Sequence, residues 1–128
     1  EGAQRADRAP FHRQVGQDRV NGLIENQGRS MEMLATSDRI GCPAGAAMAF
    51  ALDWQRSRPL LDYVALRLGI EAPACLLPDR EATADVARKL AGSAATQRAM
   101  TFGRDQMLAQ QRGLWQVIAA RHHALLSE

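Results

Sequence analysis

The chain has 128 residues, a length typical of one domain that buries a core without help from disulfides or metals. Charged residues make up 23% of it, the formal net charge is +2, and no basic cluster occurs, so we expect no nucleic-acid partner. Alanine, glutamine, arginine and leucine dominate, whereas β-branched and aromatic residues are scarce, which favours helix over strand.

The first helix is expected over residues 11–37, because apolar side chains recur there at helical spacing. Residues 1–9 are polar, and we expect them to be frayed. Three glycines interrupt the helical pattern, each costing about 1 kcal/mol relative to alanine, and Asn21-Gly22 is a turn dipeptide. The sequence therefore predicts one long helix with a weak point near Asn21, and two shorter helices are the alternative.

The second helix is predicted to be the centre of the fold. A turn over residues 38–42 places Cys42 at its N-cap and Pro43 at its first helical position. Residues 44–54 are apolar nearly all round the helix, which indicates burial, and their many alanines allow neighbouring helices to approach closely. The apolar run is far shorter than the roughly 20 residues of a membrane span. Pro59 disfavours a helical conformation at Arg58, so we expect the helix to break or kink there.

The segment after Pro59 carries another helical stripe, which we expect to end at Gly69, and residues 71–78 form a loop bracketed by prolines. Asp79 is the predicted N-cap of a short helix that stops at Gly92. Its inward face is predicted to be Ala82, Val86 and Leu90.

Ser93 is the predicted N-cap of the last helix, which runs to about Leu126. The sum is an all-α fold, an antiparallel bundle of four main helices, or five if Pro59 makes a full turn, in a single domain over residues 1–128. The core is predicted to contain Leu23, Ile24, Met31, Leu34, Met48, Phe50, Leu52, Val64, Leu68, Val86, Leu90, Leu114, Ile118 and Leu125.

Cys42 and Cys75 are candidates for a reactive thiol or a disulfide. A thiol at a helix N-terminus is activated by the helix dipole, whereas a structural cysteine is the more ordinary role. A Cys42–Cys75 disulfide requires a sharp bend at Pro59, because a straight helix from Pro43 to Leu68 is about 40 Å long. Such a disulfide would argue for an oxidising compartment.

His12 and His122 are candidate metal or haem ligands, because antiparallel first and last helices bring them to the same end of the bundle. His123 points about 100° away from His122, and the pattern lacks the paired histidines of helical metal sites, so solvated histidines are the plainer interpretation. The five methionines gather towards the opposite end; they suit Cu(I), but we favour core packing for them.

Large amphipathic aromatics and arginines could line a pocket for a small anion, with core packing and solvated arginines as the alternative. The candidate ligand-binding residues are Trp54, Arg58, Tyr63, Arg67 and Trp115. The sequence has no serine-protease triad signature, no glycine-rich phosphate loop and no zinc hydrolase motif, so we expect neither an enzyme nor a cofactor.

Three classes of function remain. The first is a non-enzymatic helical bundle with a ligand-sensing or accessory role outside the cytoplasm, suspected to be periplasmic. The second is a protein-interaction or targeting domain of a secretion or effector system, and the third is a small metal- or haem-binding protein. The partner is expected to be a protein or a small ligand, with a homodimer as one form. The chain does not begin with methionine, so we expect a processed protein or a segment of a longer one, with a membrane involved only if the longer chain is a receptor or targeting protein.

Overall fold

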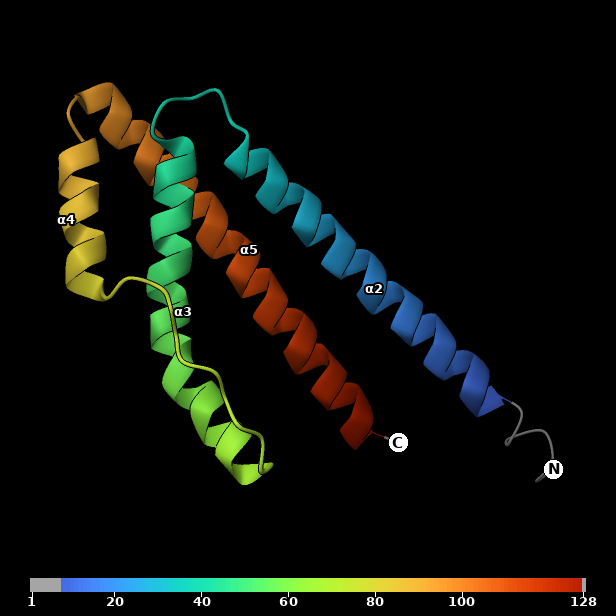
Figure 1. The fold of residues 1–128 in the computed structure, drawn as a ribbon. Helices are drawn as coiled ribbons and strands as arrows, with labels where there is room; N and C mark the ends of the chain where they lie inside the picture. The colour runs from blue at the N-terminus through green and yellow to red at the C-terminus, as the bar shows by residue number, and fades with distance from the viewer. Residues whose placement is uncertain (1–7, 128) are drawn as a thin grey trace.

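Four helices follow one another up, down, up and down in a computed structural model that describes residues 8–127 and the side chains of residues 16–127 (Figure 1). They are α2 (Arg8–Ala35), α3 (Cys42–Arg67), α4 (Arg80–Leu90) and α5 (Ala94–Leu126). No strand occurs in this described part of the chain. The predicted all-α bundle of four main helices is confirmed.

The α3–α5 pair forms the centre of the fold. These two helices run in the same direction and meet along their N-terminal halves, while α2 packs on both and α4 packs on α3 (Figure 1). Contact with all three other helices makes α3 the central helix, as its apolar composition predicted.

Two glycines permit the close approach of α3 and α5. A Cβ atom added to Gly45 would lie 2.0 Å from the Met100 carbonyl oxygen, and one added to Gly103 would lie 2.0 Å from the Cys42 carbonyl oxygen. Since real Cβ contacts are never that short, the two backbones touch at a distance only glycine allows. Around this contact lies the small core, which consists of Leu34, Cys42, Ala46, Ala49 and Met107.

The first helix is continuous, as expected, and passes through all three of its glycines. The expected fraying of residues 1–9 was wrong for Arg8 and Ala9, which lie in α2; the rest of that segment lies outside the described residues. A Cβ atom added at any of these three glycines would meet no neighbouring atom within 4 Å. Alanine would therefore fit at each position, and none of these glycines is needed for close packing against another helix.

Of the break or kink expected at Pro59, the break did not occur, so the five-helix alternative was wrong. Pro59 lies inside α3, which remains helical to Arg67 and bends in its second half (Figure 1). Proline removes one backbone hydrogen bond and crowds the preceding turn, which accounts for a bend but leaves the flanking turns intact. The start of α3 also differs by one position, because Gly41, with φ of 99°, is the cap and Cys42 is already helical.

Most predicted helix ends are confirmed. Gly69 has φ of 67°, its N–H donates to the Leu66 carbonyl, and the Ile70 N–H donates to the Ala65 carbonyl, which is the Schellman pattern. The side chains of Asp79 and Ser93 each accept a backbone N–H in the first turn of α4 and α5. The predicted stop at Gly92 is also confirmed, because α4 ends at Leu90 with Ala91 as its cap and Gly92 follows, although without a positive φ.

The predicted inward face of α4 was wrong. Thr83 is its buried residue, and Ala87 and Ala91 follow on the same side, whereas Val86 and Leu90 are exposed. The helix thus turns its small side chains towards α3 and its bulky ones outward. Helical periodicity identifies an apolar face, but it does not show whether that face meets another helix. The stripe that contains Val86 and Leu90 was therefore predicted to be buried although it faces solvent.

Much of the predicted core was also wrong. Of that set only Leu34 is fully buried, while Met31, Met48, Phe50, Leu52 and Leu114 are half-buried. Eight others are exposed, namely Leu23, Ile24, Val64, Leu68, Val86, Leu90, Ile118 and Leu125. Besides Leu34, Met100 and Met107, the buried residues are mainly alanine, glycine and cysteine, whose short side chains give no strong hydrophobic signal in the sequence.

Candidate docking surface

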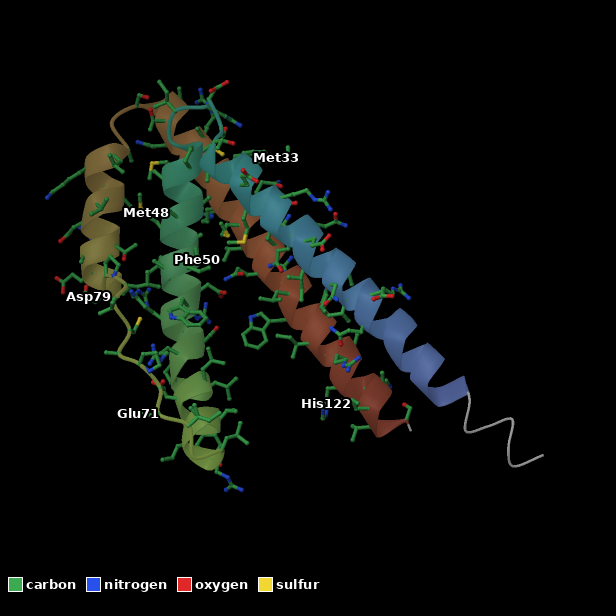
Figure 2. All side chains as sticks on the ribbon, turned by 45° about the vertical axis from the view of Figure 1, so that its right-hand side comes forward. Met33, Met48, Phe50, Glu71, Asp79 and His122 are labelled. Atoms are coloured by element: carbon green, nitrogen blue, oxygen red, sulfur yellow. The ribbon has the colours of Figure 1, made fainter. Side chains whose placement is uncertain are left out.

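The C-terminal halves of α3 and α5 diverge below their glycine contact (Figures 1 and 2). At 100° per residue, Leu60 and Val64 lie within about 40° of the direction in which Cys42 meets α5. On α5, Ile118 and Leu125 lie within about 60° of the direction of Gly103. The two faces that touch at the N-terminal ends therefore continue along both arms without touching.

Large apolar side chains on the two arms remain open to solvent. We call this surface the open face and define it by Leu60, Tyr63 and Val64 of α3 and Trp115, Ile118 and Leu125 of α5. Their exposed fractions range from 39% for Trp115 to 58% for Tyr63. Side chains of this kind usually bury against a neighbour, so a grouped exposed set indicates a surface that binds something.

Positive charge accompanies this apolar surface. Residues 106–127 contain no Asp or Glu, whereas Arg112 and Arg121 both fall in that range. Over residues 57–70 the one acidic residue, Asp62, is matched by Arg58 and leaves Arg67 in excess. These two segments carry a formal net charge of +3 in a chain of net charge +2, so the rest of the chain is slightly acidic.

Arg58 fastens the loop that follows α3 to the helix. Its Nε donates to the Asp62 carboxylate at 2.6 Å, and its guanidinium also donates to the Pro73 carbonyl oxygen. The hydrogen bond to Asp62 raises the pKa of Arg58, with a smaller contribution from Cys75 in the same loop and with desolvation acting in the opposite direction. The loop runs back along α3, with Glu71 beside the end of that helix and Asp79 at the start of α4 (Figure 2). The role of Arg58 shown by these contacts is loop anchoring.

The predicted anion site separates into different places. Tyr63 and Arg67 are exposed on the arm of α3, Trp115 lies on the facing arm of α5, and Trp54 is half-buried higher on α3. Tyr63 and Trp115 thus belong to the open face, while Arg58 is engaged with Asp62 and Pro73.

The two cysteines are not joined. Cys42 is buried at 1% exposure in the α3–α5 contact, Cys75 is exposed in the loop, and both are free thiols. Of the alternatives for these cysteines, the disulfide is not formed, because α3 continues past Pro59 and carries the following loop away from Cys42. With both thiols free, the two cysteines give no support for an oxidising compartment, and the extracytoplasmic location stays a prediction.

The predicted metal ligands do not form a centre within the described side chains. His122 is exposed near the end of α5 (Figure 2), and the side chain of His12 lies outside the described residues. In the described part, no group of three or more His, Cys, Asp or Glu is placed to hold a metal ion. Met33 and Met48 lie towards the end of the bundle opposite His122, as expected (Figure 2), and Met100 and Met107 are buried whereas Met33 is exposed. Among the described helices, none is both long and apolar enough to cross a bilayer.

Comparison with protein families gives one match, a family of unknown function (DUF6975), whose model covers residues 5–125. The chain belongs to this family. No curated protein and no solved structure matches the chain. Membership in the DUF6975 family thus covers almost all of the fold described above, and its function has to be argued from the fold itself.

The sequence contained a signal for the open face that was interpreted as core. Val64, Ile118 and Leu125 lie on correct helical stripes, and the stripes were assumed to meet inside one molecule. A sharper signal is the distribution of charge, because α5 loses all acidic residues where the two arms separate. A solvated helix face usually mixes both signs.

Proposed function

We propose that this protein is a non-enzymatic protein-interaction domain whose open face binds an amphipathic helix with an acidic polar side. The observation that carries the proposal is the pair of diverging helices with large apolar side chains exposed on them, of which all but Trp115 lie within about 60° of the sides that continue the contact. Two helices in this arrangement offer exposed apolar sides to a third helix, which would pack on them at the usual separation of about 8–10 Å.

The free energy available on the open face is substantial. Fully burying a large apolar side chain contributes about 1.5–3 kcal/mol, and each of the six residues still exposes roughly half of its surface. About 1 kcal/mol for each gives a total of about 6 kcal/mol before the cost of association. The open face thus offers enough apolar surface for a specific complex with a helix that carries several large apolar side chains.

Charge distinguishes a foreign helix from a second copy of the chain. Arg67 and Arg121 lie on the sides of the arms that continue the α3–α5 contact, and both arms carry a net positive charge. Two copies meeting through this face would oppose positive arms to positive arms, whereas an acidic helix would gain from both. This favours an acidic partner over the homodimer.

The test uses two designed helical peptides with identical apolar positions, one with glutamate and one with lysine at every polar position. We expect the glutamate peptide to bind, with an affinity that falls as salt rises, and the lysine peptide not to bind. Binding is measured by the change in tryptophan fluorescence of the protein on titration with peptides that lack tryptophan. Equal binding of both peptides, or binding of neither, contradicts the proposal.

Variants assign the binding to the open face. Ile118→Asp places a charge within the open face and should abolish peptide binding. Ala119→Asp places the same charge on another, exposed side of α5 and should leave peptide binding unchanged. Sedimentation of the protein alone examines the other occupant. A dimer that dissociates in Ile118→Asp but persists in Ala119→Asp would assign the face to a second copy and overturn the proposal of an acidic partner.

A further inference from the structure

A second region, between α3 and α4, carries an independent inference. Two pockets lie along this side of the molecule, one of about 370 Å³ near the end of α4 and one of about 540 Å³ near its start. Leu52 of α3 borders both of them. Because Leu52 lines both, the two pockets adjoin, and we call them together the α3–α4 groove; none of the residues that define the open face lines it.

One end of the α3–α4 groove is apolar. Its walls include Met48 and Leu52 of α3, Ala87 and Ala91 of α4 and Met100 of α5. Met48 projects from α3 on the side of α4 (Figure 2). Space exists here because α4 turns its small residues inward and leaves Val86 and Leu90 outside. A volume of about 370 Å³ is within the range of small-molecule sites and equals roughly a dozen water molecules at about 30 Å³ each.

The other end is rich in hydrogen-bond donors. It is lined by Leu52, Gln55, Arg56 and Arg80. The Nε2 atom of Gln55 is buried and has no hydrogen-bond partner among the described residues. A buried donor without an acceptor costs about 1–3 kcal/mol. Because the Gln55 side chain lines this pocket, a turn of its amide would bring the N–H to an acceptor bound there.

The charges of this end are also unmatched. Neither Arg56 nor Arg80 forms an ion pair within the described residues. Asp53 and Glu81 are close to these arginines in the sequence but form no ion pair with either of them, and Asp79 accepts from the Ala82 backbone N–H as the cap of α4. Arg56 and Arg80 can only donate hydrogen bonds, and Gln55 has an N–H without a partner. All three side chains line one pocket, and such a set of donors is suited to recognising an anion.

The arginines at the apolar end differ in this respect. Arg88 pairs with Asp85, and Arg104 pairs with Asp105 at 2.9 Å. Their charges are already matched by neighbours on their own helices. An anionic head group is thus directed to the end with Gln55, and an apolar body to the end with Met48.

We infer that the α3–α4 groove binds a single-chain amphiphile, with its anionic head at Gln55, Arg56 and Arg80 and its apolar chain passing Leu52 towards Met48 and Ala87. The distance along α3 from Gln55 to Gly45 is about 15 Å, which accommodates an extended chain of about a dozen atoms. Carboxylate and phosphate heads share this chemistry. This site goes beyond the proposed interaction domain and stands or falls without it.

The experiment is a calorimetric titration of the whole chain with decanoate, decanol and acetate, each below the concentration at which decanoate forms micelles. We expect decanoate to bind with one-to-one stoichiometry, decanol to bind about tenfold more weakly, and acetate not to bind measurably. Decyl phosphate in place of decanoate then distinguishes the two kinds of head group. No saturable binding of either decyl anion, or equal binding of decanoate and decanol, overturns the inference.

Two matched pairs of variants locate the site. Ala87→Phe fills the apolar end and should abolish decanoate binding, whereas Val86→Phe, at an exposed position next to it, should not. Arg56→Gln should weaken decanoate about tenfold without changing decanol, whereas Arg98→Gln, outside the groove, should change neither. Decanoate affinity that is unchanged in Ala87→Phe, or unchanged in Arg56→Gln, overturns the assignment. Ile118→Asp on the open face should leave decanoate binding intact, which separates this site from the proposed interaction surface.

Discussion

Replacing Gly103 by alanine examines the contact that holds α3 and α5 together. The added Cβ would lie 2.0 Å from the Cys42 carbonyl oxygen and 3.1 Å from the Ala46 nitrogen, and both are backbone atoms that no rotamer change can move away. The helices must separate by more than 1 Å or so, which costs about 1–3 kcal/mol or more in overpacking. Alanine returns about 1 kcal/mol through its higher helix propensity. We expect a net loss of about 1 kcal/mol and a fall in Tm of roughly 5 °C.

Gly113 provides the matched control, because it lies on the same helix and a Cβ there meets nothing within 4 Å. Gly113→Ala should therefore raise the free energy of unfolding by up to about 1 kcal/mol. Both variants are followed by urea unfolding monitored by circular dichroism at the helix band. Two changes of the same sign and size would refute the conclusion that Gly103 is required by the contact with α3, because helix propensity alone treats the two positions alike.

Three further predictions follow from local contacts. Asp79→Ala removes the cap of α4 and should lower the free energy of unfolding, measured in urea, by about 1 kcal/mol. Asp85→Ala in the same helix removes only an exposed ion pair with Arg88 and should lower it by about 0.3 kcal/mol. Similar values for the two variants would contradict the capping role of Asp79. Cys75 should react with a thiol reagent at once and Cys42 only on the timescale of unfolding, and a single fast phase for both would show that the α3–α5 contact is open. Arg58→Ala should speed amide exchange over residues 70–78, whereas Arg67→Ala should not. The pKa of Arg58 is raised, so its charge is present at every pH below the ordinary arginine pKa. Titration of Arg58 should therefore cause no loss of this protection between about pH 6 and 9.

The backbone was more predictable than the packing. Helix starts at Asp79 and Ser93 and the stop at Gly69 follow from residues within one turn, and local chemistry of this kind can be read directly. Pro59 misled because the rule for the preceding residue is a preference that the many remaining hydrogen bonds of a long helix can override. One long first helix was predicted despite its glycines, and α2 is indeed unbroken.

Packing depends on partners far away in sequence, which a single stripe does not identify. Gly45 and Gly103 were not recognised as the contact, because a glycine that permits close approach has the same appearance in a sequence as one that merely weakens a helix, such as Gly113. Neither the open face nor the α3–α4 groove was found from composition. Tyr63 and Trp115 were selected for their side-chain chemistry, and the structure places them on facing arms.

The location of the glycine contact at one end of the α3–α5 pair has a mechanical consequence. From Ala49 to Arg67 the arm of α3 is about 27 Å long, so a rotation of about 10° at the contact would move its tip by about 5 Å. Small side chains at such a pivot resist rotation less than interlocked large ones would. The C-terminal halves of α3 and α5 can therefore move apart or together to fit bound helices of different width, while the packing at the glycine contact is kept.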